Sequence, residues 1–377
     1  MSAPTPEIAI PADLLPRDGR FGCGPSKVRP EAVEALAKAS AGYMGTSHRQ
    51  ATVRFMVGAL RNGLAELLNL PDGYEVVLGN GGTTAFWDAA TYGLIERRSQ
   101  HLSFGEFSSK FAAEVEAAPF LDSPSIIESP AGTHPVAVAD RDVDAYCLTH
   151  NETSTGVAMP LARPDGAADG QLVLVDATSA AGGLRFDASQ VDVYYFAPQK
   201  NLGSDGGLWI AAMSTAAIER AERIAASDRW IPTFFDLPTA IDSSRKDQTY
   251  NTPALATLFL AVEQVEWING NGGLEWAASR CDQSARIMYG WADASSYASP
   301  FVTVPAQRSH VVATVDLDES VDAATVSAVL RRNGIVDTES YRKLGRNQLR
   351  VAMFTAIDPD DVEALTGCID HVVERLT

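Results

Sequence analysis

The chain of 377 residues contains few lysines and few cysteines. Only six of its 30 basic residues are lysines, and its four cysteines show no CxxC spacing. Scattered cysteines of this kind favour reduced thiols in a cytoplasm over disulfides or a zinc site. No apolar run approaches the roughly 20 residues that cross a bilayer, and the first 16 residues lack the features of a signal peptide. We therefore expect a cytoplasmic protein that does not bind a membrane.

Basic patches and clustered histidines are also missing. The formal net charge is −18, which repels nucleic acid, and no basic run offsets it. The six histidines form neither an HxxxH nor an HExxH pattern, so no metal site is expected. A nicotinamide-dependent enzyme is the least favoured function. The sequence lacks the glycine pattern that binds a dinucleotide and the acidic residue that follows it about 20 positions later. The apolar share of 46% and the charged share of 21% are typical of a globular protein.

Short apolar runs alternate with helical stretches between about residues 57 and 270. The runs include "DAYCLTH", "LVLVDAT", "DVYYFAP" and "GGLWIAAM". Because they are apolar at consecutive positions, they are typical of strands that are covered on both faces of a mostly parallel sheet. A long helix is predicted in "NTPALATLFLAVEQVEWINGNGG", with Thr252 as its N-cap, Pro253 at its first position and Gly270 at its end.

The pattern changes near residue 270. A helix is predicted in "GLEWAASRCDQSARIMYGWADA", and a β-α-β-β-α order follows, with strands in "HVVATVDL", "IVDT" and "NQLRVAMF". A chain of this length favours two domains. We therefore predict an α/β protein with a large domain over 21–270 and a smaller α+β domain over 271–377. An N-terminal arm over 1–20 is predicted to pack against the small domain.

Polar residues follow several of the apolar runs, at the place where open α/β sheets bind ligands. Asp176 follows "LVLV" and carries a charge out of a buried strand, although an aspartate at this place also caps turns. Among the six lysines, only Lys200 is delivered by an apolar strand into a glycine-rich turn. A partly desolvated lysine has a lowered pKa and reacts with carbonyl groups. Lys200 is therefore where we expect a covalently bound cofactor.

The segments "GTSHRQ", "HNETSTG", "VDATSAAGG", "FAPQKNLGSDGG" and "NTPA", in this order, resemble those of the phosphoserine aminotransferase family. These proteins are class-V aminotransferases of fold type I that depend on pyridoxal 5′-phosphate. The likeness runs from "RFGCGPSKVRP" to the C-terminus, which is nearly the whole chain. It implies a large domain built on a mostly parallel sheet of the seven-stranded type and a smaller C-terminal α+β domain.

The resemblance also implies roles for individual residues. Lys200 would bind the cofactor covalently and move a proton, and Asp176 would keep the pyridine nitrogen protonated. Phe107 would stack on the ring where the family often has a tryptophan, although it also suits the core side of a helix. Further cofactor contacts are implied for Thr83, Thr84, Thr153, Gln199, Asn251 and Thr252. The last two would come from the neighbouring subunit, so a homodimer with shared sites is expected.

Substrate binding is implied for His48, Arg49 and Arg350, because arginine forks onto carboxylates and histidine with arginine suits a phosphate. The chain departs from one common version of the family where Thr84 replaces an arginine, and where "YRKLGR" replaces a His-Arg pair. Arg342, Lys343 or Arg346 would supply the missing charge, and Arg342 is our choice.

The implied reaction is a reversible amino transfer between glutamate and 3-phosphohydroxypyruvate. It gives 2-oxoglutarate and O-phosphoserine for serine biosynthesis, and a role in pyridoxine biosynthesis is left open. Alternatives are an alanine–glyoxylate or serine–glyoxylate type aminotransferase and a non-catalytic α/β binding protein. A cysteine desulfurase is disfavoured, because Cys281 and Cys368 sit in helical stretches rather than on a mobile loop.

Overall fold

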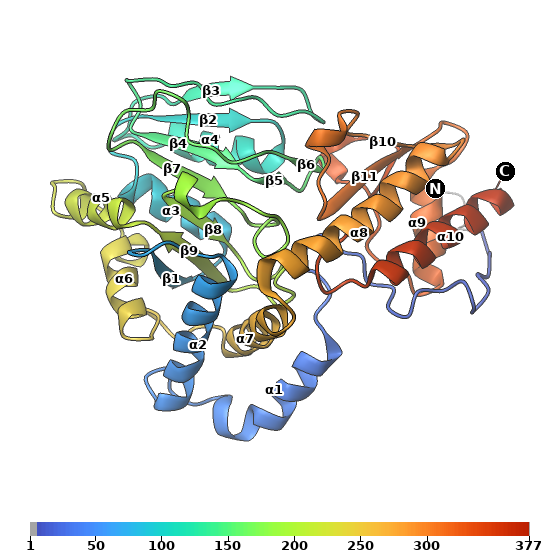
Figure 1. The fold of residues 1–377 in the computed structure, drawn as a ribbon, viewed down its shortest axis with the longest axis horizontal. Helices are drawn as coiled ribbons and strands as arrows, with labels where there is room; N and C mark the ends of the chain where they lie inside the picture. Colours follow the sequence, from blue (N-terminus) through green and yellow to red (C-terminus); the bar gives the residue numbers. More distant parts are fainter. Residues whose placement is uncertain (1–5, 377) are drawn as a thin grey trace.

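The computed structural model describes residues 6–376 and contains two main sheets, which the long helix α8 (Gly273–Ala294) connects (Figure 1). The larger sheet has seven strands in the order β1-β9-β8-β7-β4-β2-β3. Their bounds, in the same order, are Glu75–Asn80, Leu208–Met213, Val193–Phe196, Leu172–Asp176, Ala145–Thr149, Ser99–Ser103 and Ser125–Glu128. Only β9 runs antiparallel to its neighbours. The predicted, mostly parallel sheet is confirmed.

Helices cover both faces of this sheet, and each face has its own apolar core. On one face, Val76 and Leu78 pack with α2 (Ala51–Leu67) and α7 (Leu255–Gly270), next to which lies α1 (Pro30–Tyr43). On the other face, Val77 packs with a second group of helices. This group comprises α3 (Thr83–Gly93), α4 (Glu106–Glu116), α5 (Thr215–Ala225) and α6 (Leu237–Arg245). Because successive residues of a strand point to opposite faces, strands buried on both sides are apolar throughout.

The smaller sheet is antiparallel, in the order β10-β11-β12. It comprises Ala298–Pro300, Val312–Leu317 and Gln348–Ala352, and it packs with α8, α9 (Ala323–Arg332) and α10 (Pro359–Leu376) around a third core. The prediction of a strand in "IVDT" was wrong. Val336 forms only an isolated bridge with Arg20, because Asp337 has a positive φ of 65° that ends the extended backbone. Strand β10, which precedes β11, takes the third place in the sheet.

The described part of the N-terminal segment lies against the small sheet's core. Ile10 is buried there, and its N–H donates to the Asn333 side chain, which in turn donates to the Ile8 carbonyl. Residues 1–5 of the predicted arm lie outside the described residues. The division into an arm, a large domain and a small domain stays a prediction. No helix of residues 6–376 is long and apolar enough to cross a membrane.

Helix α7 begins later than predicted. Its N-cap is Ala254 rather than Thr252, and its first residue is Leu255. The Thr252 hydroxyl instead shares a hydrogen bond of 3.1 Å with Nδ1 of His48. The helix ends at Gly270, as predicted.

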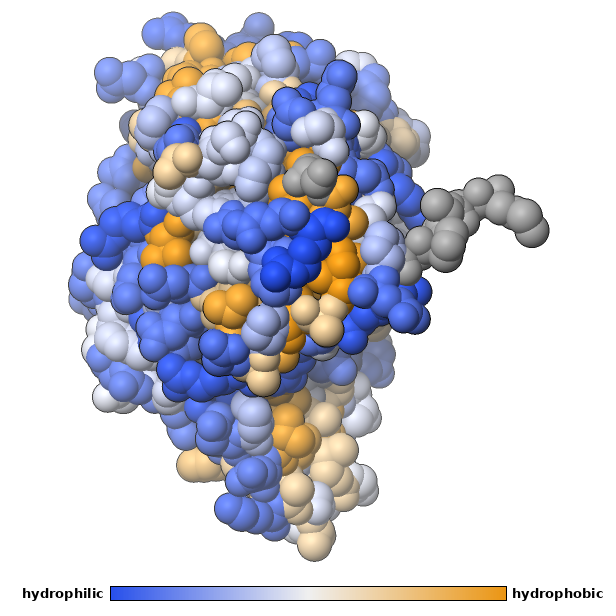
Figure 2. Space-filling model, turned by 90° about the vertical axis from the view of Figure 1, so that its right-hand side faces the viewer, coloured by the Kyte–Doolittle hydropathy of each residue, from blue (hydrophilic) through white to orange (hydrophobic). Residues whose placement is uncertain are grey.

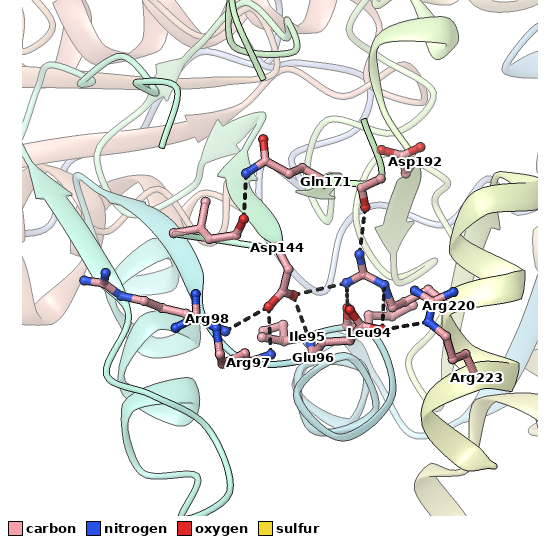
Figure 3. Close-up of polar contacts among 12 residues, drawn as sticks. Leu94, Ile95, Glu96, Arg97, Arg98, Asp144, Gln171, Asp192, Arg220 and Arg223 are labelled. Carbon is pink, nitrogen blue, oxygen red and sulfur yellow. Dashed lines mark hydrogen bonds and ion pairs between the residues drawn. The ribbon is translucent and has the colours of Figure 1, made fainter. Parts of the chain in front are cut away.

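A buried ion pair fastens the loops at the amino ends of the large sheet's strands (Figure 3). Arg220 on α5 is only 4% exposed, and its guanidinium contacts Asp144 at 3.1 Å. It also donates to the carbonyls of Leu94 and Gly170. Asp144 in turn accepts from three consecutive backbone N–H groups, those of residues 96–98, just before β2. This network therefore stabilises the edge of the sheet that lies opposite Asp176.

Replacing Arg220 with methionine is expected to lower the free energy of unfolding by about 3–5 kcal/mol, because Asp144 then loses its buried cationic partner. Arg223→Met is the matched control, since Arg223 lies on the same helix but is exposed and pairs with Glu96 at the surface. We expect this control to lose less than about 1 kcal/mol. Urea unfolding followed by circular dichroism measures both losses. Equal losses would contradict the assignment.

Candidate active site

One cavity of about 200 Å³ lies where the parallel strands of the large sheet end. Residues from several strand ends and helix starts line it, namely Gly82, Thr83, Thr84, Trp87, Phe107, Asn151, Thr153, Asp176, Thr178, Gln199 and Lys200. The fold brings these segments together because β1, β4, β7 and β8 run in the same direction and end at the same edge. Seven of the nine residues predicted to contact a cofactor therefore share one cavity.

The amine of Lys200 lies in the wall of this cavity. Its Nζ donates to the Cys23 carbonyl at 2.8 Å. Burial lowers the pKa of Lys200 to about 8, and the nearby positive charge of Arg350 acts in the same direction. Gly24, with φ of +140°, leaves the space for this amine, since a Cβ there would lie 2.0 Å from Nζ. The lysine is therefore both desolvated and closely surrounded.

The turn that carries Lys200 is tied to the N-terminal segment. The Ser26 N–H donates to the Gln199 carbonyl at 3.0 Å, and the Ser26 hydroxyl donates to the Lys200 carbonyl. The same segment is also attached to the small sheet, where the Ala352 N–H donates to the Phe21 carbonyl. Residues 21–26 therefore join the small sheet to the reactive turn.

The carboxylate of Asp176 ends β7 and is only 5% exposed. One oxygen accepts from the Thr178 N–H at 2.9 Å and from its hydroxyl at 2.5 Å. The other oxygen accepts from Nε1 of Trp87 at 3.1 Å. Burial raises the pKa of Asp176 to about 6, and these hydrogen bonds limit the increase. The carboxylate is therefore mostly ionised at neutral pH.

Sequence reasoning missed both partners of Asp176. Thr178 carried a signal, because a residue two positions after an aspartate often donates to its side chain in a turn. Trp87 carried a weaker one, because four residues after Thr83 it lies on the same face of α3. The hydroxyl of Thr178 also accepts from the Thr83 hydroxyl at 2.8 Å, because its own proton is donated to Asp176. The start of α3 and the end of β7 are thus joined by side chains.

Phe107 lies in the first turn of α4, whose start is held by the buried Glu152. The Glu152 carboxylate accepts from the N–H groups of Phe107 and Ser108, at 3.1 and 2.9 Å, and from the Ser154 hydroxyl at 2.7 Å. The Phe107 ring lines the cavity and also packs against the apolar core. The position of Phe107 is therefore compatible with stacking on a cofactor ring and also with packing on the core side of a helix. Glu152, the middle residue of "NET", was not predicted.

The predicted substrate-binding residues are divided between two places. Arg350 on β12 lies beside the cavity, and its Nη1 donates to the Thr153 carbonyl at 3.4 Å. His48 lies instead with Thr252, whose carbonyl accepts from Asn80 at 2.8 Å. His48, Arg49, Asn251 and Thr252 are absent from the lining of the cavity. Within one chain, the fold does not bring these four residues to Lys200.

Three basic residues were candidates for the missing positive charge, and two of them already have carboxylate partners. Lys343 pairs with Glu106 at 2.5 Å, and Arg346 pairs with Asp316 at 2.5 Å. Arg342 is exposed in the short 3₁₀ turn Arg342–Leu344, and no ion pair to it is found among residues 6–376. Of the three, Arg342 is thus the one available to a ligand.

The lining of the cavity fits pyridoxal 5′-phosphate. The Lys200 amine suits an aldehyde, the Asp176 carboxylate suits a protonated ring nitrogen, and Phe107 offers an aromatic face. Helix α3 begins after Gly82 without a side-chain cap, so its first N–H groups are available to a phosphate. The buried side-chain oxygens of Gln199 and Asn151, both in the lining, have no hydrogen-bond partner among the described residues. Such orphaned groups in a cavity are typical of a ligand site.

Comparison with known proteins places this site in a family. The model of the family described as Aminotransferase class-V matches residues 21–339. The chain is 62% identical over 373 residues to a phosphoserine aminotransferase of Nocardioides sp., a match that covers 99% of this chain and 100% of the relative.

Two solved structures share the fold. The phosphoserine aminotransferase of Cytophaga hutchinsonii superimposes with a TM-score of 0.87 at 22% identity, over 94% of this chain and 99% of that one. The enzyme of Bacillus circulans subsp. alkalophilus gives 0.82 at 23% identity, over 95% and 99%. Because the family model matches most of the chain and the Nocardioides relative is 62% identical over nearly its whole length, the chain belongs to the class-V aminotransferase family.

Proposed function

We propose that the protein is a phosphoserine aminotransferase. It moves an amino group between glutamate and 3-phosphohydroxypyruvate, as part of serine biosynthesis in the cytoplasm. The observation that carries the proposal is the single cavity that holds the Lys200 amine, the Asp176 carboxylate and the uncapped start of α3. The 62% identity to the Nocardioides enzyme supports the choice of substrates. A role in pyridoxine biosynthesis stays a prediction.

Bound pyridoxal 5′-phosphate supplies an electron sink for the charge left when a proton leaves the amino acid's Cα. Lys200 is the residue that binds the cofactor covalently and moves this proton. Burial lowers the pKa of its amine to about 8, which brings the neutral form that can accept a proton closer to neutral pH. The ionised Asp176 holds the positive charge of the ring nitrogen. The start of α3 binds the phosphate.

Arg350 is the residue that binds the substrate's carboxylate. It lies close enough to Lys200 to lower the pKa of that amine. Its Nε is buried without a hydrogen-bond partner among the described residues. A planar guanidinium can take a carboxylate through two parallel hydrogen bonds. The substrate's distal phosphate is then bound by Arg342 and by the pair His48 and Arg49.

The enzyme is proposed to act as a homodimer in which each site takes residues from both chains. His48 and Thr252 share a hydrogen bond at the surface. Both therefore belong to the group of residues that one chain would contribute to its partner's site. Nε2 of His48 is buried but has no partner in the described part of the chain. Apolar side chains are exposed in the same region of the chain, including Met44, Phe55 and Tyr250. Apolar side chains also gather at the lowest part of the molecule in Figure 2, where α1 lies.

Mixing two inactive variants tests the shared sites. Lys200→Ala is co-expressed with the double variant His48→Ala, Arg49→Ala, each chain carrying a different tag. If residues 48 and 49 act in the partner's site, each mixed dimer has one intact site, and random pairing restores about a quarter of the wild-type activity. If they act in their own chain, every site keeps one defect and no activity returns.

Assays of three acceptors with glutamate as donor test the choice of substrate. We expect kcat/KM for 3-phosphohydroxypyruvate to exceed the values for hydroxypyruvate and glyoxylate by at least about a hundredfold, because these two acceptors lack the phosphate that the cationic groups would bind through charge-assisted hydrogen bonds. A preference for glyoxylate would instead favour the alternative of a glyoxylate aminotransferase. Absence of all transfer, with the cofactor bound, would favour a non-catalytic binding protein.

A further inference from the structure

Arg350 has an unusual set of contacts for a half-buried cation. No carboxylate of residues 6–376 forms an ion pair with its guanidinium, and the one hydrogen bond found for this group among these residues, to the Thr153 carbonyl, is long at 3.4 Å. The guanidinium instead lies over an aromatic ring, 5.2 Å from the centre of the Tyr341 ring. A cation at this distance over an aromatic face is attracted by the ring's electrons. The ring therefore helps to decide where this guanidinium lies.

Tyr341 is itself held in place from both sides. Its ring centre lies 6.0 Å from that of Phe107, which lines the cavity. Two residues later, Lys343 pairs with Glu106 at the start of α4. Two residues before Tyr341, the backbone of Glu339 forms an isolated antiparallel β-bridge with Leu349, the neighbour of Arg350 on β12. Tyr341 is thus fixed between a wall of the cavity and the arginine.

We infer that Tyr341 is a positioning residue that holds the Arg350 guanidinium in place for the substrate's carboxylate. The inference rests on the proposed function, in which Arg350 binds that carboxylate. Tyr341 acts through the face of its ring, and its hydroxyl is not required. Glutamate and the oxo-acid acceptor both carry a carboxylate next to the reacting carbon. The ring therefore matters equally for both half-reactions.

Kinetics of the holoenzyme separate this role from a structural one. Tyr341→Leu removes the aromatic face but keeps an apolar side chain. We expect it to raise KM for both substrates by a similar factor, about five- to twentyfold, with kcat nearly unchanged, because binding in the ground state and in the transition state is weakened alike. Tyr341→Phe is the matched control, and it should keep KM within about twofold of the wild-type value. The thermal midpoint and the cofactor's absorbance should stay unchanged in both variants.

Pairing with Arg350→Gln shows whether Tyr341 acts through the arginine. Alone, Arg350→Gln should lower kcat/KM by at least about a hundredfold, since the charge that holds the carboxylate is lost. Adding Tyr341→Leu should then change kcat/KM by less than about twofold, because no cation is left to position. A full additional loss in the double variant would overturn the inference, as would a normal KM in Tyr341→Leu.

The two proposals fail in different ways. If Arg350→Gln alone leaves kcat/KM unchanged, the role of Arg350 in the proposed function is wrong. If Arg350→Gln is impaired but Tyr341→Leu is normal, only the positioning role of Tyr341 is wrong. If Tyr341→Phe is as impaired as Tyr341→Leu, the hydroxyl is what matters, and a role of the ring face is contradicted.

Discussion

Lys200→Arg is expected to lower kcat by on the order of 10⁴-fold or more, because one side chain both attaches the cofactor and moves the proton. Arginine stays protonated at every accessible pH, so it can perform neither task. The variant should still fold, since the cationic group remains in the cavity wall. Steady-state amino transfer from glutamate measures the loss.

Chemical trapping checks where the cofactor is attached. Borohydride reduction of the wild-type holoenzyme, followed by peptide mass mapping, should find the label on Lys200 alone. Lys110→Arg is the control, because Lys110 lies on the nearby helix α4 but pairs with Glu106 at the surface. It should keep both the label and the activity. A label on another lysine would contradict the assignment of Lys200.

Asp176→Asn is expected to lower kcat by about 10²–10³-fold, the usual effect of losing a preorganised charge at a reacting group. At pH 7 the wild-type carboxylate is mostly ionised, because its pKa of about 6 lies below that pH. Asparagine keeps the shape but provides no negative charge for the ring nitrogen. Cofactor affinity, measured by titration of absorbance, should fall together with kcat. A variant with normal kcat would contradict the role of Asp176.

The cofactor-free protein offers an independent test of Asp176. The pKa of Asp176 is about 6 in the folded chain and 3.8 in an unfolded one. Between these two pH values the folded state therefore binds more protons than the unfolded state. The free energy of unfolding should therefore fall by about 2 kcal/mol from this group as pH rises from about 4 to 6. Asp176→Asn should lack that contribution. Urea unfolding at both ends of the range measures the difference, and identical pH dependence in the two proteins would contradict the raised pKa.

The large sheet and the pair Lys200 and Asp176 could be predicted because each depends on local patterns. Strands covered on both faces must be apolar throughout, and parallel strands bring their ends to the same edge. An aspartate and a lysine at the ends of two such strands then meet, whatever the loops between them do. The structure accordingly has both residues in the lining of one cavity, while their roles stay a prediction.

The rest of the site depends on packing between distant segments. Trp87 reaches Asp176 only because α3 crosses the end of β7, and Glu152 holds α4 only because a short strand turns it toward that helix. The strand predicted in "IVDT" failed at Asp337, whose positive φ no apolar pattern reveals. His48 and Arg350 were expected in one pocket, but within one chain His48 lies with Thr252. Residue patterns within one chain do not indicate where a second subunit would lie, so the surroundings of His48 could not be predicted from them.

The short segment over residues 21–26 has a practical consequence for handling the enzyme. One end is hydrogen-bonded to the small sheet at Ala352, and its Cys23 carbonyl holds the Lys200 amine. A truncation or affinity tag that disturbs this stretch would change the basicity of the reactive nitrogen, in addition to any effect on expression. Recombinant versions are therefore best extended at the C-terminus, which leaves this tether untouched.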